Sequence, residues 1–399
     1  MKHQYQTEVF WKKGLQKFAD FFIDIYARFF IDKSLDDQLV EPKNILFVSL
    51  GHLGDALIDS YVFPLIHERY PNVQIDVLTG EWCKPVFENN PYVRKLIFFN
   101  HFRINRSEIS LWEKTRIHIK SSHSALDTIR SQKYDISIEG RISHPNGNLL
   151  TYRGKIKRRI GFGSGGFGSL LTDEVSVPAR AQFHILEAVL EELMKIGIVK
   201  KLEEIKPYFT VSKHRTLKRH PLQNYFNDSF IIVHPESGNV NRMFGDEFWL
   251  EVVKIILDEK KYKIIICGTS SKSINLIDFL LANVPNAKEQ IINAVQKLSI
   301  DEFYLLAERA RAAITLESLP AHLCAITCET ISFYKNGPGT LFFPIPKKNV
   351  SIIHNHPQSR NVDVHTGLRN YCVKEFEIKE TYRLFSDLIK SWYSDKNKV

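Results

Sequence analysis

The amino-acid sequence predicts an α/β protein built from two doubly wound, Rossmann-like domains that follow a helical arm. The chain has 399 residues, which is too long for one ordinary core and sufficient for two. Short buried strands alternate with helices in each half of the chain, a pattern typical of parallel sheets. A stretch containing Pro207 and Pro221 reads as the connection. We therefore expect an arm at residues 1–42 and domains at 43–215 and 216–399.

Each domain is expected to supply its own sheet, because apolar runs rich in isoleucine and valine recur along the chain. In the first domain the predicted strands are 44–50, 73–78, 96–99 and 134–138, and the predicted helices are 56–70 and 107–132. In the second domain the predicted strands are 230–233, 262–267, 312–315 and 331–333, and the predicted helices are 248–258, 301–309 and 321–326. Such sheets bind ligands at the carboxyl ends of their strands, which places the expected active site in a cleft between the domains.

The composition is that of a globular protein with an excess of positive charge. The net charge is +9 and the pI is about 9.1, which favours an anionic partner: a nucleotide, a phosphorylated lipid, an anionic membrane or nucleic acid. The five cysteines are irregularly spaced, and we expect free thiols in a reducing cytoplasm. No signal peptide and no apolar run long enough to span a bilayer are visible, so a cytoplasmic protein is expected.

An amphipathic helix is predicted within the arm, over residues 9–31. Large apolar residues recur at steps of three and four and form one stripe, comprising Trp11, Leu15, Phe18, Phe22, Ile25 and Phe29. Charged residues occupy the other faces, namely Lys12, Lys13, Lys17, Asp20, Asp24 and Arg28. Such a helix could pack on the body of the protein or on a dimer partner, or it could lie on the inner membrane as a peripheral anchor.

Residues 49–55, with the sequence SLGHLGD, form the first candidate site. They follow a predicted strand and lead into a predicted helix, and Gly51 and Gly54 on either side of His52 permit close approach by a substrate. Asp55 falls in the first turn of the helix, where the helix dipole favours an ionised carboxylate that could act as a general base. Aspartate is also a common helix cap, so a structural role for Asp55 stays open.

Two loops in the second domain could hold phosphate groups. After the strand at 230–233, Ser237 and Gly238 could donate hydrogen bonds, and Arg242 could neutralise a phosphate. In the second loop the start of the helix at 321–326 would present free N–H groups to an anion.

Ser318 and His322 could add side-chain donors to that second loop. The first loop could equally be an ordinary loop with an arginine on the surface. In the second loop, a single histidine at the start of a helix is more often structural.

The basic residues of the first domain gather in two clusters. The denser one comprises Arg153, Lys155, Lys157, Arg158 and Arg159, and the looser one Arg103, Arg106, Lys114, Arg116 and Lys120. These clusters are either solvated faces or a surface for an anionic acceptor or lipid. Nucleic acid is not expected, because no recognised binding motif accompanies them.

Two further observations argue against a dinucleotide-binding site and against a metal site. Residues 161–166, GFGSGG, fit a dinucleotide-binding pattern, but they follow a basic run instead of a buried strand, so we interpret them as a mobile loop. The chain has no D-x-D motif and no other cluster with obvious metal-ligand spacing, so we expect no metal and no cofactor.

Five blocks of the sequence, in order and over about residues 43–345, resemble glycosyltransferase family 9, the ADP-heptose lipopolysaccharide heptosyltransferase-like enzymes of the GT-B fold. The blocks are the strand–turn–helix segment from NILFVSLGHLGD, QKYDISIEGR, RRIGFG with HILEAVLEELMKIGI, IIVHPESGNVNRMFGDEFW, and LSIDEFYLLAERARAAITLESLPAHLCA. The resemblance implies an inverting sugar transfer from a nucleotide sugar, without a metal.

The resemblance also implies roles by position. Asp55 matches the family's general base, and Arg242 matches the basic residue, usually lysine, that contacts the donor phosphates. The other donor-side residues are Ser237, Gly238, Gly268, Glu317, Ser318 and His322. The acceptor-side residues are Gly51, His52, Gly54, Arg158 and Arg159.

The departures from the family pattern all lie in the donor half. Glu317 stands where the family has aspartate, and Leu319-Pro320 replaces a glycine-led turn. Lys272 falls where many members place a ribose-binding glutamate, and the family's F-G-P-T block is interrupted by an insertion within residues 333–340. The donor therefore need not be ADP-heptose.

The leading hypothesis is an inverting, metal-independent glycosyltransferase that acts on a cell-surface glycan or a phosphorylated, lipid-linked acceptor. Two alternatives stay open. The chain could be a catalytically degenerate scaffold that binds a nucleotide or glycan, or a sugar-nucleotide epimerase with Glu317 and His322 as acid and base. Association into a homo-oligomer is also left open.

Overall fold

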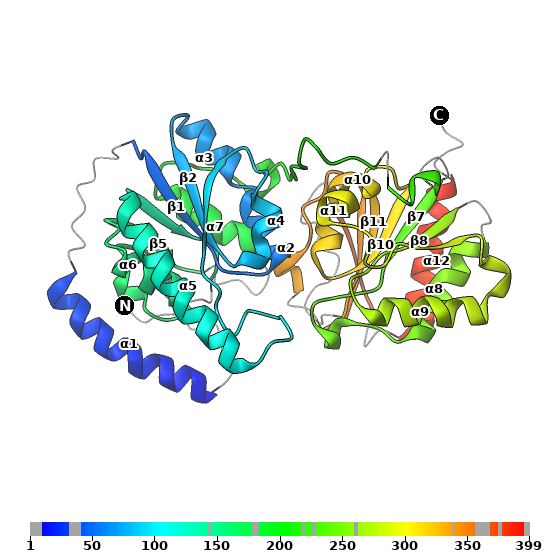
Figure 1. The fold of residues 1–399 in the computed structure, drawn as a ribbon, viewed down its shortest axis with the longest axis horizontal. Helices are drawn as coiled ribbons and strands as arrows, with labels where there is room; N and C mark the ends of the chain where they lie inside the picture. Colours follow the sequence, from blue (N-terminus) through cyan, green and yellow to red (C-terminus); the bar gives the residue numbers. More distant parts are fainter. Residues whose placement is uncertain are drawn as a thin grey trace. The chain divides into compact units, whose positions relative to one another are not determined.

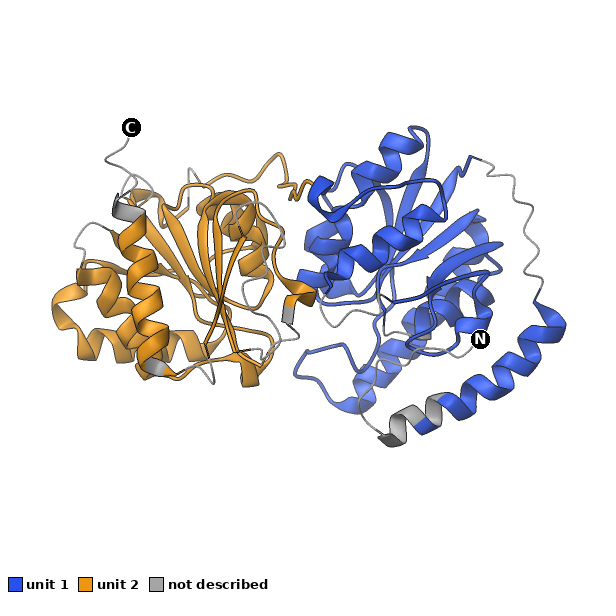
Figure 2. Cartoon of the chain, turned by 180° about the vertical axis from the view of Figure 1, so that it is seen from behind, with its two compact units in different colours: residues 1–205 blue, residues 206–399 orange. Residues whose placement is uncertain are grey.

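The structure is a computed structural model, and it divides into two compact units, residues 1–205 and 206–399 (Figure 2). Each unit contains one parallel sheet covered by helices (Figure 1), as the alternation of strands and helices predicts. The division falls at residue 205, where the sequence suggested a boundary at 215. The structure describes residues 10–31, 41–142, 145–177, 183–217, 220–225, 229–258, 262–336, 339–355, 368–373 and 377–394.

Unit 1 is organised around a six-stranded parallel sheet in the order β3-β2-β1-β4-β5-β6, in which the strand order reverses beside β1. Its strands are β1 (Asn44–Ser49), β2 (Gln74–Thr79), β3 (Val93–Phe98), β4 (Ile136–Glu139), β5 (Arg158–Phe162) and β6 (Asp173–Val175). Its helices are α1 (Phe10–Phe30), α2 (Leu53–Ser60), α3 (Phe63–Arg69), α4 (Lys84–Phe87), α5 (Leu111–Gln132), α6 (Pro145–Arg153) and α7 (Ile185–Met194), with short 3₁₀ turns η1 (Glu81–Cys83), η2 (Gly168–Leu170) and η3 (Leu202–Glu204).

The helix predicted over 56–70 is two helices, α2 and α3, separated at Tyr61 and Val62. Pro64 lies in the first turn of α3. Proline has no N–H to donate to the preceding turn and its ring clashes with the carbonyl four residues back, so it begins a new helix more readily than it continues an old one.

The expectation that no buried strand precedes the glycine-rich segment is wrong. Residues 158–162 form β5, which is buried almost throughout. Arg159 is only 6% exposed, and its guanidinium donates to the carbonyl oxygens of Leu170 at 2.7 Å and Lys157 at 3.2 Å. The strand was not predicted because its arginines suggested an exposed segment. An arginine can nevertheless be buried when backbone carbonyl oxygens accept its hydrogen bonds.

Unit 2 contains a seven-stranded parallel sheet in the order β13-β12-β11-β10-β7-β8-β9. Its strands are β7 (Phe230–His234), β8 (Lys263–Ile266), β9 (Ile291–Asn293), β10 (Ala312–Leu316), β11 (Glu329–Tyr334), β12 (Val350–His354) and β13 (Leu368–Cys372). Its helices are α8 (Asp246–Asp258), α9 (Ser271–Asn283), α10 (Ile300–Ala307), α11 (Leu319–Thr327) and α12 (Ile378–Ser394), with 3₁₀ turns η4 (Gln223–Tyr225), η5 (Val240–Arg242), η6 (Pro285–Ala287) and η7 (Gly339–Phe342).

Aromatic side chains from two helices and one strand pack together in the core of unit 2. Trp249 of α8, Phe333 of β11 and Phe385 of α12 are fully buried, and Phe248 meets Phe333 edge to face with ring centroids 5.1 Å apart. This packing ties α12 to the sheet and leaves the carboxyl ends of β7, β8 and β10 to carry the polar loops.

Two further expectations were that the cysteines are free thiols and that no segment spans a membrane. All five cysteines are free thiols, four of them buried, as their spacing suggested. Within the described part of the chain, no helix combines the length and the apolar character that crossing a membrane requires.

Candidate functional site

Asp55 lies in the first turn of α2, directly after the carboxyl end of β1, which is the central strand of unit 1. Its Oδ2 accepts a hydrogen bond of 2.7 Å from the backbone N–H of His52, the residue that precedes the helix. A Cβ atom on Gly51 would come within 2.8 Å of the same oxygen. Glycine at position 51 is therefore required to bring the Asp55 carboxylate against the turn.

The guanidinium of Arg141 holds the other oxygen of the Asp55 carboxylate, with Nη1 2.5 Å from Oδ1. Burial alone would raise the pKa of Asp55, but the charge of Arg141 and the His52 amide outweigh it, and the pKa lies below its ordinary value. Asp55 is thus an ionised, partly accessible carboxylate at the carboxyl edge of the sheet.

Arg141 was not among the predicted site residues. It lies two positions after β4, and β4 pairs with β1 in parallel, so the carboxyl ends of both strands meet where Asp55 stands. The usable signal was a charged residue just beyond a strand that neighbours the strand preceding Asp55.

Three buried carboxyl groups lie in the interior of unit 1 near this turn: Asp59 of α2, Glu139 of β4 and Glu192 of α7. Ser49 Oγ donates to Asp59 at 2.6 Å. Burial, reinforced by the negative charges of one another or of Asp55, raises the pKa of all three groups well above the ordinary range. These shifts favour the protonated form of each group, whereas the shift of Asp55 favours its ionised form.

The predicted acceptor-side arginines are both engaged inside unit 1. Arg158 pairs with Asp173 at 3.1 Å and donates to the carbonyl of Lys195 at 2.8 Å. Arg159 is buried and donates to backbone carbonyl oxygens, as described above. Neither guanidinium is brought to Asp55 by these contacts.

In unit 2, the loop after β7 carries a carboxylate with an unusually complete set of donors. Glu236 accepts hydrogen bonds from the backbone N–H groups of Thr269 and Ser270 and from three hydroxyl groups, those of Thr269, Ser270 and Ser273. Although burial opposes ionisation, these donors lower the pKa of Glu236 to about 2. The start of α9 is therefore already occupied by an anion from the chain itself.

The loops of unit 2 that the sequence assigned to phosphates do lie together. Ser237 Oγ donates to the carbonyl of Glu317 at 3.0 Å, and Ser318 Oγ donates to the carbonyl of Glu236 at 3.3 Å. Arg242 reaches the buried Glu317 carboxylate, with Nη1 2.9 Å from Oε1. The residues thus form one cluster at the carboxyl ends of β7 and β10.

The other predicted donor-side residues have more varied surroundings. Gly268 is needed beside Glu236, because a Cβ there would come within 2.7 Å of Oε1. His322 is buried in α11, whereas Lys272 is exposed in the first turn of α9. Ser318 precedes α11, and Pro320 occupies the first turn of that helix.

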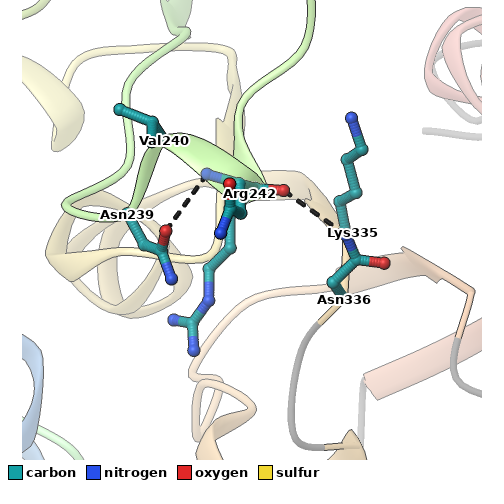
Figure 3. A pocket seen from close by; sticks show the side chains of 6 residues that line it. Asn239, Val240, Arg242, Lys335 and Asn336 are labelled. Atoms are coloured by element: carbon teal, nitrogen blue, oxygen red, sulfur yellow. Dashed lines mark hydrogen bonds between the residues drawn. The ribbon is translucent and has the colours of Figure 1, made fainter.

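A polar pocket of about 520 Å³ adjoins this cluster, and Figure 3 shows the side chains around it. Its volume falls within the roughly 300–1,000 Å³ typical of small-molecule sites. The side chains of Arg242 and Lys335 extend in opposite directions in this view, and Lys335 Nζ donates to the carbonyl of Met243 at 3.3 Å. The lining residues are Asn239, Val240, Asn241, Arg242, Lys335 and Asn336.

Two parallel-sheet units, each with polar loops at the carboxyl ends of its strands, are the architecture expected of the GT-B fold. Comparison with known proteins makes the class definite. Residues 123–371 match the family model described as glycosyltransferase family 9 (heptosyltransferase). That match covers more than half of the chain, and the protein therefore belongs to this family of glycosyltransferases.

Curated relatives and solved structures agree with the family assignment. Lipopolysaccharide heptosyltransferase 3 of Escherichia coli is 21% identical over 276 residues, which are 68% of this chain and 76% of that protein. The fold resembles that of E. coli ADP-heptose lipopolysaccharide heptosyltransferase II, with a TM-score of 0.60, 16% identity, and coverage of 87% of this chain and 99% of that one. It also resembles E. coli heptosyltransferase WaaC with ADP-2-deoxy-2-fluoro heptose, with a TM-score of 0.62, 12% identity, and coverage of 88% and 99%. The predicted GT-B fold is confirmed.

Among the described residues, no group of three or more His, Cys, Asp and Glu side chains is arranged to hold a metal ion.

Proposed function

We propose that this glycosyltransferase moves a heptose or a related sugar from a nucleotide-sugar donor to a cell-surface glycan or a phosphorylated, lipid-linked acceptor. Inversion at the anomeric carbon and independence of a metal are part of the proposal. The single observation that carries it is the Asp55 carboxylate, ionised and partly accessible at the end of the central strand of unit 1.

In the proposed step, Asp55 accepts the proton of the acceptor hydroxyl while the hydroxyl oxygen forms a bond to the anomeric carbon. The bond between that carbon and the donor phosphate breaks, and the nucleotide leaves with the electron pair. A carboxylate of low pKa is a weak base, but the hydroxyl becomes strongly acidic as its oxygen bonds to an oxocarbenium-like carbon. Proton transfer therefore accompanies bond formation and does not precede it.

The donor is assigned to unit 2. Arg242, the hydroxyl groups of Ser237 and Ser318 and the polar pocket beside them are suited to a phosphorylated sugar, because charge-assisted bonds stabilise the departing phosphate without a metal. The heptosyltransferases that resemble this chain include one solved with ADP and one solved with an ADP-heptose analogue. We therefore propose a nucleotide sugar as the donor of this protein as well. The proposal does not specify the base of the nucleotide.

We also place the enzyme in the cytoplasm, where nucleotide sugars are available, with peripheral attachment to the inner membrane. We propose metal independence because the sequence has no D-x-D motif.

Calorimetry with ADP-, GDP-, UDP- and CMP-linked sugars in the presence of EDTA tests the donor assignment. Binding of one nucleotide class without metal, lost in Arg242→Ala, is expected. Binding that requires added metal would overturn metal independence, and binding without transfer to any glycan acceptor would favour the scaffold alternative.

A further inference from the structure

Helix α1 is attached to unit 1 by its polar side. Asp20 is 2% exposed and accepts a 2.7 Å hydrogen bond from the backbone N–H of Phe167, and Asp24 accepts one from the hydroxyl of Ser169. Ala27, on the same side of the helix, is buried. The docking side of α1 is therefore formed by positions 20, 24 and 27, which follow one another at helical spacing.

A further hydrogen bond fixes the rotation of α1 about its axis. The hydroxyl groups of Tyr26 and Tyr152 lie 2.7 Å apart, and their rings meet edge to face. Because Tyr152 belongs to α6, α1 contacts both α6 and the turn around η2.

The described part of the aromatic stripe predicted from the sequence faces away from the rest of unit 1, while the side chains of Trp11 and Leu15 lie outside the part that the structure describes. Phe29 follows Asp20 by nine positions, about two and a half helical turns, so it points to the opposite side. Its side chain is 74% exposed, and that of Phe18 is 66% exposed. The other large apolar side chains exposed on this helix are Phe21, Phe22, Ile25, Tyr26 and Phe30. Packing on the body, one of the two interpretations of the sequence, thus occurs, but through the polar side.

The acidic and basic residues of α1 also differ in their surroundings. Both acidic residues, Asp20 and Asp24, bond to unit 1, whereas Lys17 and Arg28 are exposed. A helix surface that combines aromatic side chains with accessible cations complements the interface of an anionic bilayer, where rings enter the headgroup region and cations meet lipid phosphates.

We propose that the outward face of α1, defined by Phe18, Phe22, Ile25 and Phe29, lies on the surface of an anionic membrane and holds unit 1 there. A soluble protein rarely leaves so many contiguous apolar side chains uncovered, so a partner for this face is required. The charge pattern selects anionic lipid over a second copy of the chain, whose matching face would carry the same exposed cations. This inference rests on the peripheral attachment proposed above, for which it names the helix face and the lipid class, and it does not depend on the proposed reaction.

Flotation of the full-length protein with vesicles tests the proposal. We expect binding to phosphatidylcholine vesicles that contain phosphatidylglycerol, and weaker binding to phosphatidylcholine alone. The double variant Phe22→Glu/Phe29→Glu should bind about tenfold less or worse, because charged side chains oppose insertion at the interface. Val199→Glu, at another exposed apolar position, is the matched control and should bind as the unaltered protein does.

Two further measurements keep the outcomes separate. The variant Phe22→Ser/Phe29→Ser removes the aromatic rings without adding negative charge, and it should also lose most of its binding. Light scattering without vesicles reports the oligomeric state. Equal vesicle binding by all variants would overturn the proposal, as would a dimer of the unaltered protein that both double variants convert to monomer.

Discussion

The guanidinium of Arg242 lies 2.9 Å from the carboxylate of Glu317, so the cation expected to meet the donor phosphates is already neutralised within unit 2. Glu317 is 5% exposed, and it occupies the position where the family pattern has the shorter aspartate. The extra methylene extends the carboxylate by about one carbon–carbon bond. If the donor binds at Arg242 as proposed, its phosphate must therefore compete with Glu317 for the same guanidinium.

From this pairing we predict that Glu317→Gln strengthens donor binding. The amide keeps the size of the side chain but removes a negative charge beside the phosphate and loosens its hold on Arg242. The affinity for a nucleoside diphosphate should rise roughly threefold to tenfold, about 1 kcal/mol, as measured by calorimetry. Glu329→Gln, which disrupts the separate ion pair with Arg311, is the control and should leave affinity unchanged. Weaker binding by Glu317→Gln would show that the carboxylate positions Arg242 for the donor.

Asp55→Asn should reduce transfer by about 10²-fold to 10⁴-fold while leaving donor binding unchanged, because an amide cannot accept the acceptor proton. The asparagine can still accept the hydrogen bond from His52, so the turn is preserved. Steady-state transfer and calorimetry on the same preparations provide the measurement.

The matched control is Asp59→Asn, one helical turn further along α2. Burial raises the pKa of Asp59 and so favours its neutral form, which an amide resembles, so Asp59→Asn should support nearly normal transfer. Equal losses in the two variants would mean that any change in this region disturbs unit 1, and Asp55 would lose its role as the base.

The pH dependence of transfer should reveal the pairing of Asp55 with Arg141. In the unaltered protein the pKa of Asp55 is below its ordinary value, so the acidic limb of kcat/KM should lie below about pH 4. In Arg141→Gln the opposing cation is gone and burial then raises the pKa.

The acidic limb of Arg141→Gln should therefore move upward by about one pH unit or more, and transfer at mildly acidic pH should fall before transfer at neutral pH does. A pH profile of unchanged shape, merely scaled down, would show that Arg141 acts on the acceptor or on folding and does not tune Asp55.

Much of the fold could be predicted because the central strands are uninterrupted apolar runs, as in β1 and β7. Strand β5 was hidden by Arg158 and Arg159, whose burial depends on carbonyl oxygens supplied from elsewhere in the chain. Helix α9 was missed since its first turn, Ser-Lys-Ser, is polar and owes its stability partly to the Glu236 carboxylate.

The individual site residues were easier to propose than the pairs that they form: Glu317 was predicted, but its pairing with Arg242 was not. Asp55 and Arg242 stand beside recognisable turns, but the residues that pair with them come from other strand ends: Arg141 from beyond β4 and Glu317 from beyond β10. Only the sheet order brings those ends together. The orientation of α1 likewise depends on which of its faces can accept hydrogen bonds from donors on unit 1. The spacing of apolar residues in the sequence does not predict this.

The buried carboxyl groups of unit 1 predict that its stability decreases as the pH rises. Glu192 is fully buried, and desolvation, followed by the charges of Glu139 and Asp59, raises its pKa well above the ordinary range. In the unfolded chain this group loses its proton near pH 4, whereas in the folded protein the raised pKa lets it keep the proton to a higher pH. The contribution to stability is complete below the unfolded pKa and is lost as the pH rises toward the folded pKa.

Glu192→Gln replaces the protonated acid with a neutral group of the same size, so the melting temperature should vary less between pH 5 and 8. At the upper end it should exceed that of the unaltered protein by about 2–4 °C for each kcal/mol recovered. Glu191→Gln, at the exposed neighbouring position, should follow the unaltered profile. If Glu192→Gln instead melts lower at every pH, the carboxylate must be ionised and paired in the folded state, and the protonated cluster near Asp55 would be ruled out.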